Sequence, residues 1–216
     1  MRKWILFLGF CCSVFCSEDS ESVFTKIYQR ANWGINEEGM GFSGAGSTLP
    51  NAYKYIAFLE EFIKDNHIRT IVDAGCGDWT FSKEIVWGDV QYLGVDVVKG
   101  VIAANIEKYE TDKIRFECLD ILSSELPAAD LLICKDVLMH LSNSDIIHFM
   151  KSIKKFKHCL FTNNLGKGNE NRDIHRGGFR PLDLKKPPFN FNGINIFKYS
   201  TDHSEKQVFY MGNHEN

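Results

Sequence analysis

The chain contains the stretch Ile71-Val72-Asp73-Ala74-Gly75-Cys76-Gly77-Asp78-Trp79, in which an apolar run ends in an acid and two closely spaced glycines. This order is typical of a parallel β-strand that passes into a ligand-binding turn and then a helix. Glycines allow the backbone to approach a ligand that a Cβ atom would displace. Thr80 stands where dinucleotide-binding turns carry a third glycine, which counts against a dinucleotide site.

Segments with the periodicity of strands and helices alternate through the middle of the chain, and such alternation predicts a doubly wound, mostly parallel sheet. Two further strand-like runs near the C-terminus predict an antiparallel hairpin. The predicted fold class is therefore α/β, with a seven-stranded, mostly parallel sheet closed by the hairpin. The predicted strands are 69–74, 91–96, 114–119, 130–134, 158–162, 194–200 and 206–211. The predicted helices are 22–30, 51–66, 81–86, 99–109 and 142–156.

The composition is that of one globular domain, with 216 residues, 44% of them hydrophobic and 25% charged. The net charge is −3, so the chain lacks the basic excess of an electrostatic nucleic-acid binder, and we expect no nucleic-acid partner. Lysines at positions 151, 154, 155 and 157 end a predicted helix, where cations are favoured.

The N-terminus has the pattern of a secretory signal. Arg2 and Lys3 precede an apolar run over residues 4–15, which small and polar residues follow. This predicts a signal peptide at residues 1–16, cleaved after Cys16, and a secreted or periplasmic protein. The run is too short to span a membrane as a stable anchor, and no stable membrane span is expected after the signal is cleaved. The alternative is a protein anchored in the membrane by an uncleaved N-terminus.

Four cysteines lie outside that segment, at positions 76, 118, 134 and 159. They form no C-x-x-C pair, so no metal site is predicted. Three of them fall in predicted strands, where disulfide geometry is rarely available, and we expect free thiols.

Acids follow or end four of the predicted strands, at Asp73, Asp96, Asp120 and Asp136. The carboxyl ends of parallel strands meet at one edge of a sheet, where ligands bind. Each acid by itself could be a turn former. Their regular recurrence favours a shared ligand site.

The segment at 72–77 resembles the first motif of class I S-adenosylmethionine (SAM)-dependent methyltransferases. Gly94-Val95-Asp96 is similar to their second motif, and the segment at 134–141 is similar to their D-V-L-x-H-L stretch. The segments Trp33-Gly34 and 43–47 are similar to a bacterial small-molecule-type subgroup. The resemblance extends from about residue 24 to residue 211. With the N-terminal pattern, it predicts three parts: the signal peptide 1–16, an N-terminal helix with a glycine-rich lid at 17–50, and a methyltransferase domain at 51–216.

The resemblance implies SAM as the cofactor. Asp96 is placed to accept from the ribose hydroxyls, and Asp120 from the adenine amino group. Asp73 lies near the ammonium end, and the glycine turn admits the amino-acid half. The predicted cofactor-binding residues are Asp73, Gly75, Cys76, Gly77, Asp96, Val97, Asp120, Ile121 and Lys135.

Methyl transfer needs alignment of two reactants and no covalent nucleophile, and a base is needed only where the acceptor must lose a proton early. The candidate catalytic residues are His140, Lys135 and Asp136. His140 is the one that titrates near neutrality. The alternatives are that His140 packs or caps a helix and that Lys135 pairs with Asp136.

Two segments and one strand end are candidates for binding the acceptor. Trp33, Ser43 and Ser47 belong to a glycine-rich loop that could close as a lid or remain a surface loop. Arg180 could bind a carboxylate or phosphate, or could hold Asp183 in a turn. Asn163 could position a substrate amide or turn the chain.

These residues predict a SAM-dependent methyltransferase that acts on a small or peptide-like polar acceptor. One alternative is a non-catalytic SAM-binding module that acts through a protein partner. A nicotinamide dehydrogenase is a further alternative, against which Thr80 and the C-terminal hairpin count.

Overall fold

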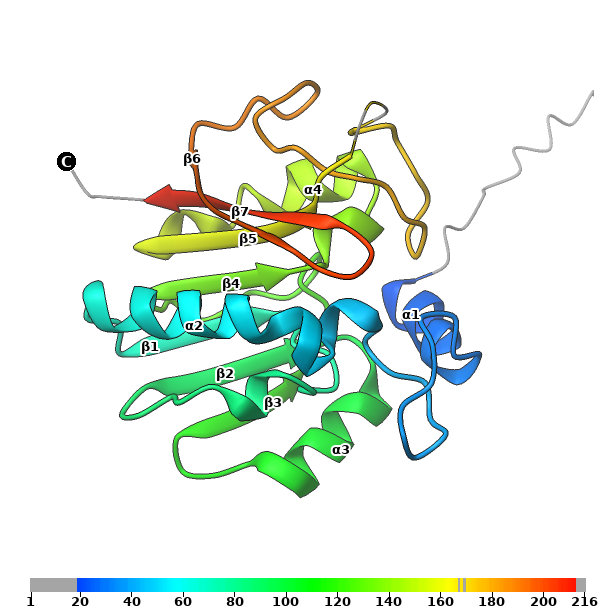
Figure 1. Ribbon diagram of the computed structural model, residues 1–216, viewed down its shortest axis with the longest axis vertical. Helices are drawn as coiled ribbons and strands as arrows, with labels where there is room; N and C mark the ends of the chain where they lie inside the picture. The colour runs from blue at the N-terminus through cyan, green and yellow to red at the C-terminus, as the bar shows by residue number, and fades with distance from the viewer. Residues whose placement is uncertain (1–18, 167, 169, 213–216) are drawn as a thin grey trace, which may run out of the picture.

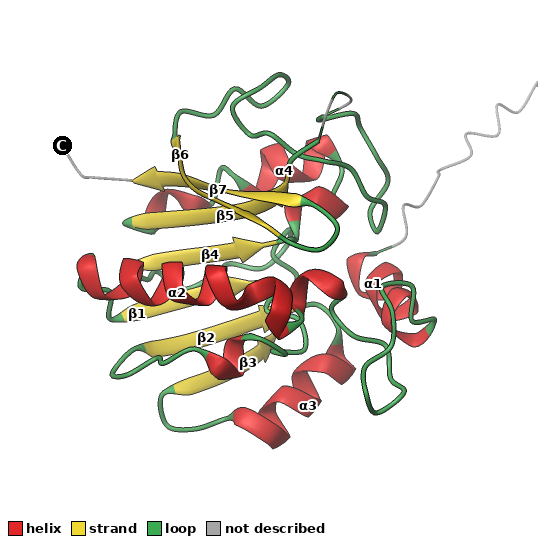
Figure 2. Cartoon of the chain, viewed as in Figure 1, coloured by secondary structure: helices red, strands yellow, loops and turns green. Residues whose placement is uncertain are grey.

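A seven-stranded sheet with the strand order β3-β2-β1-β4-β5-β7-β6 forms the centre of the molecule (Figures 1 and 2). The computed structural model describes residues 19–166, 168 and 170–212. β1 to β5 are parallel, whereas β7 runs antiparallel to β5 and β6 antiparallel to β7. The strands are β1 (Thr70–Ala74), β2 (Gln91–Asp96), β3 (Ile114–Cys118), β4 (Leu131–Lys135), β5 (His158–Asn164), β6 (Ile194–Ser200) and β7 (Glu205–Gly212).

The predicted fold class is confirmed, and all seven predicted strands are present. The strands at 91–96 and 194–200 have the predicted bounds. Three helices lie close to their predictions, and the fourth is shorter. The helices are α1 (Ser20–Gln29), α2 (Leu49–Asp65), α3 (Lys99–Tyr109) and α4 (Asn143–Phe149).

Two predicted helices are wrong in length. The segment at 81–86 forms only the 3₁₀ turn η2 (Ser82–Glu84), because the indole of Trp87 donates to the Ser82 carbonyl and the Val86 N–H donates to Glu60. The predicted helix at 142–156 ends at Phe149. Its last carbonyl accepts from the Ser152 hydroxyl at 2.8 Å, a local bond that competes with helix continuation. The 3₁₀ turn η4 (Ile153–Lys155) follows.

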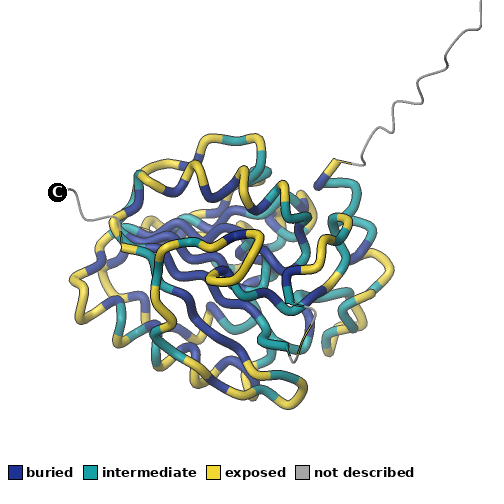
Figure 3. The backbone as a smooth tube through the Cα atoms, turned by 90° about the horizontal axis from the view of Figure 1, so that it is seen from above, coloured by how far each residue is buried: buried dark blue, intermediate teal, exposed yellow. Residues whose placement is uncertain are grey.

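Helices cover both faces of the sheet, because side chains along a strand alternate between the two faces. Ile71 of β1 packs in a cluster with Leu59 of α2 and with side chains of α3. Its neighbour Val72 packs on the opposite face in a cluster with Phe149 of α4. Figure 3 shows these buried strands as a dark-blue band through the middle of the molecule.

The carboxyl ends of β1, β2 and β4 point toward α1, which lies beyond that edge of the sheet (Figure 1). β7 is antiparallel, so it begins at the same edge: Lys206 is paired in register with Asn164 at the end of β5. The edge therefore collects residues from both ends of the chain.

The predicted signal peptide at 1–16 and its cleavage concern residues outside the described part of the chain. Among the described residues, no helix is long and apolar enough to cross a membrane, and no three His, Cys, Asp or Glu side chains are grouped to hold a metal ion. The cysteines at 76, 118, 134 and 159 are free.

Candidate active site

A cavity of about 290 Å³ opens at the carboxyl edge of the sheet. Its walls come from α1, the loop before α2, the ends of β1, β2, β4 and β5, and the start of β7. Most of the predicted site residues meet there. Those that line it are Trp33, Ser43, Ser47, Asp73, Gly75, Cys76, Gly77, Asp96, Val97, Asp120, Ile121, Lys135, Asp136 and His140.

Two predicted acceptor-binding residues do not line the cavity. Asn163 is buried within β5, and side chains of a strand alternate, so its neighbour Asn164 faces the cavity instead. Arg180 is completely buried: its guanidinium donates to the Leu138 carbonyl and to Asn143, both at 3.0 Å. Arg180 therefore braces the segment after β4, and its prediction as a substrate ligand is wrong.

The glycine turn after β1 has the backbone conformation that its sequence predicts. Gly75 and Gly77 have φ angles of 82° and 57°, in the left-handed region. A Cβ atom on Gly75 would lie 2.3 Å from Val137, and one on Gly77 would lie 2.3 Å from the Ser43 hydroxyl. Glycine is thus required for the turn to pass so close to its two neighbouring segments.

The carboxylate of Asp96 lies at the end of β2 and faces the turn. It accepts from the backbone N–H groups of Gly77 at 3.1 Å and Val98 at 3.0 Å. Burial raises the pKa of Asp96, and these two hydrogen bonds oppose that rise. The fixed carboxylate retains lone pairs for further donors at the cavity wall.

Asp73 is buried at the end of β1 and belongs to a short hydrogen-bonded chain. The Tyr92 hydroxyl donates to its carboxylate at 2.7 Å, and the Trp79 indole donates to that hydroxyl at 2.9 Å. Burial raises the pKa of Asp73 to about 7, against the opposing effects of Tyr92 and Lys135. The group can therefore change charge near neutral pH.

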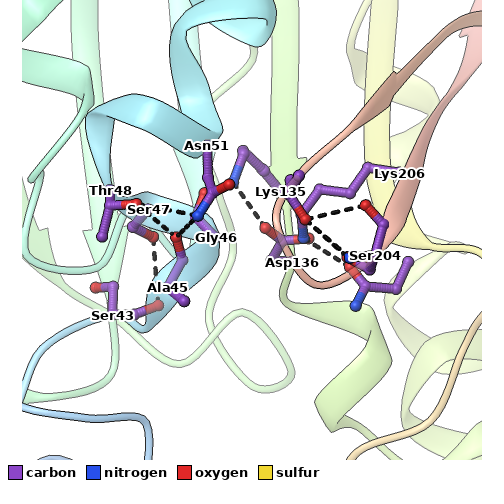
Figure 4. A network of polar contacts seen from close by, with 12 residues as sticks. Ser43, Ala45, Gly46, Ser47, Thr48, Asn51, Lys135, Asp136, Ser204 and Lys206 are labelled. Atoms are coloured by element: carbon purple, nitrogen blue, oxygen red, sulfur yellow. Dashed lines mark hydrogen bonds and ion pairs between the residues drawn. The ribbon is translucent and has the colours of Figure 1, made fainter.

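Asp136 lies between two buried lysines (Figure 4). The ammonium groups of Lys135 and Lys206 each lie 2.7 Å from one of its oxygens. Lys135 also donates to the Gly46 carbonyl at 3.1 Å, and Lys206 to the Asn164 amide oxygen at 2.6 Å. Burial raises the pKa of Asp136, but the lysines outweigh it and hold the pKa at about 2.

This arrangement bears on two candidate catalytic residues. Lys135 and Asp136 form an ion pair, which is the alternative that the sequence left open. A carboxylate with a pKa near 2 is too weak a base to accept a proton at neutral pH. His140 is left as the candidate base among the three.

The ring of His140 is fixed by a backbone group. Its Nδ1 lies 2.7 Å from the Gly178 carbonyl oxygen, which can only accept, so Nδ1 carries the proton and Nε2 carries a lone pair. Burial lowers the pKa of His140 and favours this neutral form. The rings of Trp33 and Phe179 lie 5.0 and 6.0 Å from the imidazole, between ring centroids.

The loop before α2, predicted as a lid, is bonded to the glycine turn. The Ser43 N–H donates to the Asp78 carboxylate at 3.0 Å, and the Asp78 N–H donates back to the Ser43 hydroxyl at 3.0 Å. That hydroxyl also bonds Tyr28 at 2.7 Å. The Ser47 hydroxyl donates to the Ser43 carbonyl at 3.3 Å. The loop thus forms a wall of the cavity.

Sequence reasoning missed several residues of the cavity wall. Phe24 and Tyr28 come from α1, and the sequence of that helix does not show which part of the sheet it packs against. Lys206 could have been found from topology, because an antiparallel strand that follows five parallel strands must begin at their carboxyl edge. The missed residues that line the cavity include Phe24, Tyr28, Asn164, Phe179 and Lys206.

Comparison with known proteins supports one activity. Residues 71–157 match a family model described as a methyltransferase domain. No curated protein sequence matches the chain. The chain carries a methyltransferase domain.

Solved methyltransferases share the fold of this domain. N-methyltransferase NodS from Bradyrhizobium japonicum WM9, in complex with S-adenosyl-L-homocysteine (SAH), is 12% identical, with a TM-score of 0.64 over 92% of this chain and 100% of that chain. Magnesium protoporphyrin IX methyltransferase from Synechocystis PCC 6803, with bound SAH, is 11% identical, with a TM-score of 0.62 over 89% and 98%. Human N-acetylserotonin methyltransferase, in complex with SAM, is 14% identical, with a TM-score of 0.56 over 89% and 59%.

The residues of the methyltransferase domain suit SAM in their chemistry. Asp96 and Asp120 offer acceptors at neighbouring strand ends, as ribose hydroxyls and an adenine amino group require. Apolar side chains of Leu119 and Ile121 flank the same part of the cavity. The buried carboxylate of Asp73 suits an ammonium group. These acceptors and apolar side chains therefore fit the cofactor.

Proposed function

We propose that this methyltransferase transfers a methyl group to a small or peptide-like polar acceptor, with His140 as the general base. The observation that carries the proposal is the bond between Nδ1 of His140 and the Gly178 carbonyl, which leaves the Nε2 lone pair available in the cavity. Bound SAM supplies a sulfonium methyl group as the electrophile. His140 then takes the proton that an attacking hydroxyl, amine or thiol must lose.

In this proposal the cofactor lies over β1 and β2. Asp96 accepts from the ribose hydroxyls, and the backbone of Gly75 and Gly77 bounds the amino-acid half. Asp120 and Ile121 bind the adenine, and Asp73 binds the ammonium group. Support comes from the fact that all six of these residues line the cavity.

The acceptor lies in the part of the cavity next to His140. Trp33 and Phe179 supply aromatic walls there, and the loop bonded through Ser43 limits access of water. Alignment of the two reactants and exclusion of water are the main contributions that the chain makes to an in-line displacement.

The test combines binding and turnover. Titration calorimetry with SAM and SAH measures cofactor affinity, and release of SAH from SAM is then followed with hydroxyl, amine and thiol acceptors. We expect micromolar or tighter cofactor binding and SAH release that depends on one acceptor class. Binding of SAM with no SAH release from any acceptor would favour a non-catalytic SAM-binding module.

We also propose that the chain is exported through residues 1–16. The basic, apolar and polar segments of the N-terminus support this. Sequencing the N-terminus of the mature protein tests it: a start at residue 17 is expected, and a retained Met1 would favour the membrane anchor.

A further inference from the structure

The cluster around Asp136 carries more positive than negative charge. Lys135 and Lys206 both contact the single carboxylate of Asp136, and the side chains of both lysines are 5% exposed. The remaining oxygen partners, from Asn164 and Gly46, are neutral. Among the described residues, the two ammonium groups therefore share one ion-paired carboxylate, and the carboxyl of Asp73, which interacts with Lys135 and has a pKa of about 7, offsets the excess positive charge only in part.

An uncompensated buried charge is costly, and an anion beside it recovers that cost. Burial lowers the pKa of Lys206, against the opposing effect of Asp136. An anionic group at this wall would stabilise the charged ammonium and would gain charge-assisted hydrogen bonds.

The position of Lys206 separates it from the proposed cofactor wall. The strand order changes direction between β1 and β4, and ligands of such sheets bind across that point. Asp96 and the glycine turn lie on the β1–β2 side. Lys206 is the second residue of β7 and Asn164 ends β5, on the other side of β4.

The space around Lys206 is kept open by a glycine. A Cβ atom on Gly46 would lie 3.2 Å from both the Lys206 ammonium nitrogen and an Asp136 oxygen. The Asn164 amide points its oxygen at Lys206, so its NH₂ group faces away from the ammonium and remains a donor at the cavity wall.

We infer that the methyl acceptor carries an anionic group, a carboxylate or a phosphate, which Lys206 and the amide of Asn164 bind while His140 faces the nucleophile. This inference rests on the proposed function, because it names the acceptor half of the same cavity. It predicts that analogues of the acceptor in which a neutral group replaces the anionic one are poor substrates.

The test uses the full chain loaded with SAH, with benzoate and its neutral analogue benzamide as probes. Saturation-transfer NMR measures binding of each probe. We expect benzoate to bind about tenfold more tightly than benzamide, as a charge-assisted contact implies. Displacement of benzoate by acetate or by inorganic phosphate distinguishes the two anion classes.

Three variants locate the contact. Lys206→Met removes the ammonium, and Asn164→Asp keeps Lys206 but neutralises the excess charge; we expect both to lose the preference for benzoate. Lys198→Met is the matched control, because Lys198 is exposed on the neighbouring strand β6, outside the cavity. Circular dichroism and the thermal midpoint check that each variant folds.

Equal binding of benzoate and benzamide to the wild-type SAH complex would overturn the inference. So would benzoate that binds the SAH-free protein but is displaced by SAH, since the lysines would then hold the carboxylate of the cofactor. Failure to bind SAH at all contradicts the proposed function instead, and calorimetry with SAH alone reveals that outcome.

Discussion

The Nδ1 atom of His140 lies 2.7 Å from the carbonyl oxygen of Gly178, a residue 38 positions later in the chain. The two segments that carry them are bonded twice more through their backbones: the Gly177 N–H donates to the His140 carbonyl at 2.9 Å, and the Arg180 N–H donates to the Met139 carbonyl at 3.3 Å. The orientation of the imidazole is thus set by a loop that has no regular secondary structure.

Replacement of His140 by Gln tests the proposed base. The amide can keep a hydrogen bond to Gly178 but cannot accept the proton of the nucleophile. We expect kcat to fall by roughly 10²–10⁴-fold, the range typical of a lost general base. SAH affinity, measured by calorimetry, should stay within a factor of about two, because the residue lies outside the proposed cofactor wall. An unchanged kcat would remove His140 from the mechanism.

Arg180 should act as a positioning residue for His140. Arg180→Met keeps much of the apolar volume but loses the donors to Leu138 and Asn143. We expect kcat to fall about tenfold or more while SAH affinity is retained. The pKa of His140, followed by NMR, should rise toward its ordinary value as the brace loosens and water enters. A variant with normal kcat and an unmoved His140 pKa would show that Arg180 only supports the fold.

Replacing Asp96 should weaken cofactor binding far more than replacing an acid next to the other end of β2. We expect Asp96→Ala to weaken SAM binding by about 2–4 kcal/mol, because charge-assisted hydrogen bonds to the ribose are lost. Asp89→Ala is the control, since Asp89 is exposed just before β2 and pairs with Lys113. Calorimetry at one pH measures both variants. Equal affinities for the two would remove Asp96 from the site.

Cofactor affinity should depend on pH through Asp73. Its pKa of about 7 means that the carboxyl is largely protonated at pH 6, whereas an ammonium group binds the ionised form. SAH binding at pH 6 should therefore release a proton, and affinity should rise as pH increases through 7. Calorimetry in two buffers of different ionisation enthalpy measures the released proton. Asp73→Asn should abolish this proton release, and its persistence in that variant would assign it to another group.

Gly77 and Gly88 form a matched pair for testing the glycine turn. Both have left-handed backbones, with φ of 57° and 59°, but a Cβ atom would be blocked by Ser43 at Gly77 and would meet nothing within 4 Å at Gly88. We expect Gly88→Ala to lower the free energy of unfolding by about 1–2 kcal/mol. Gly77→Ala should cost a further ~1–3 kcal/mol from overpacking and should weaken SAH binding. Urea unfolding measures both, and equal losses would contradict the close contact.

The central strands β1 and β4 were predictable because each combines an apolar run with a polar residue near its carboxyl end. Val72 and Leu132 belong to these apolar runs, which are buried from both faces of the sheet. The helix after β4 was harder, because Ser152 ends it through a side-chain bond to the Phe149 carbonyl that periodicity does not reveal.

The cavity was predicted best where its residues follow a strand directly. Asp73, Asp96 and Asp136 were located by that rule. The prediction failed for Arg180, because a polar residue in a loop can bind backbone carbonyls as readily as a ligand. It missed Lys206 although the topology places the start of β7 at this edge, because the register that brings Lys206 beside Asn164 is not visible in the sequence of either strand.

The mutual bonds between Ser43 and Asp78, and the bond from Lys206 of β7 to Asp136, have a consequence for fragments of the protein. The part that matches the methyltransferase family, residues 71–157, contains neither Ser43 nor Lys206. Shortened versions that keep only this matching middle part should bind the nucleoside poorly and catalyse nothing. Cofactor affinity can therefore report that the segment around Ser43 has folded onto the sheet, and methyl transfer can report the same for β7.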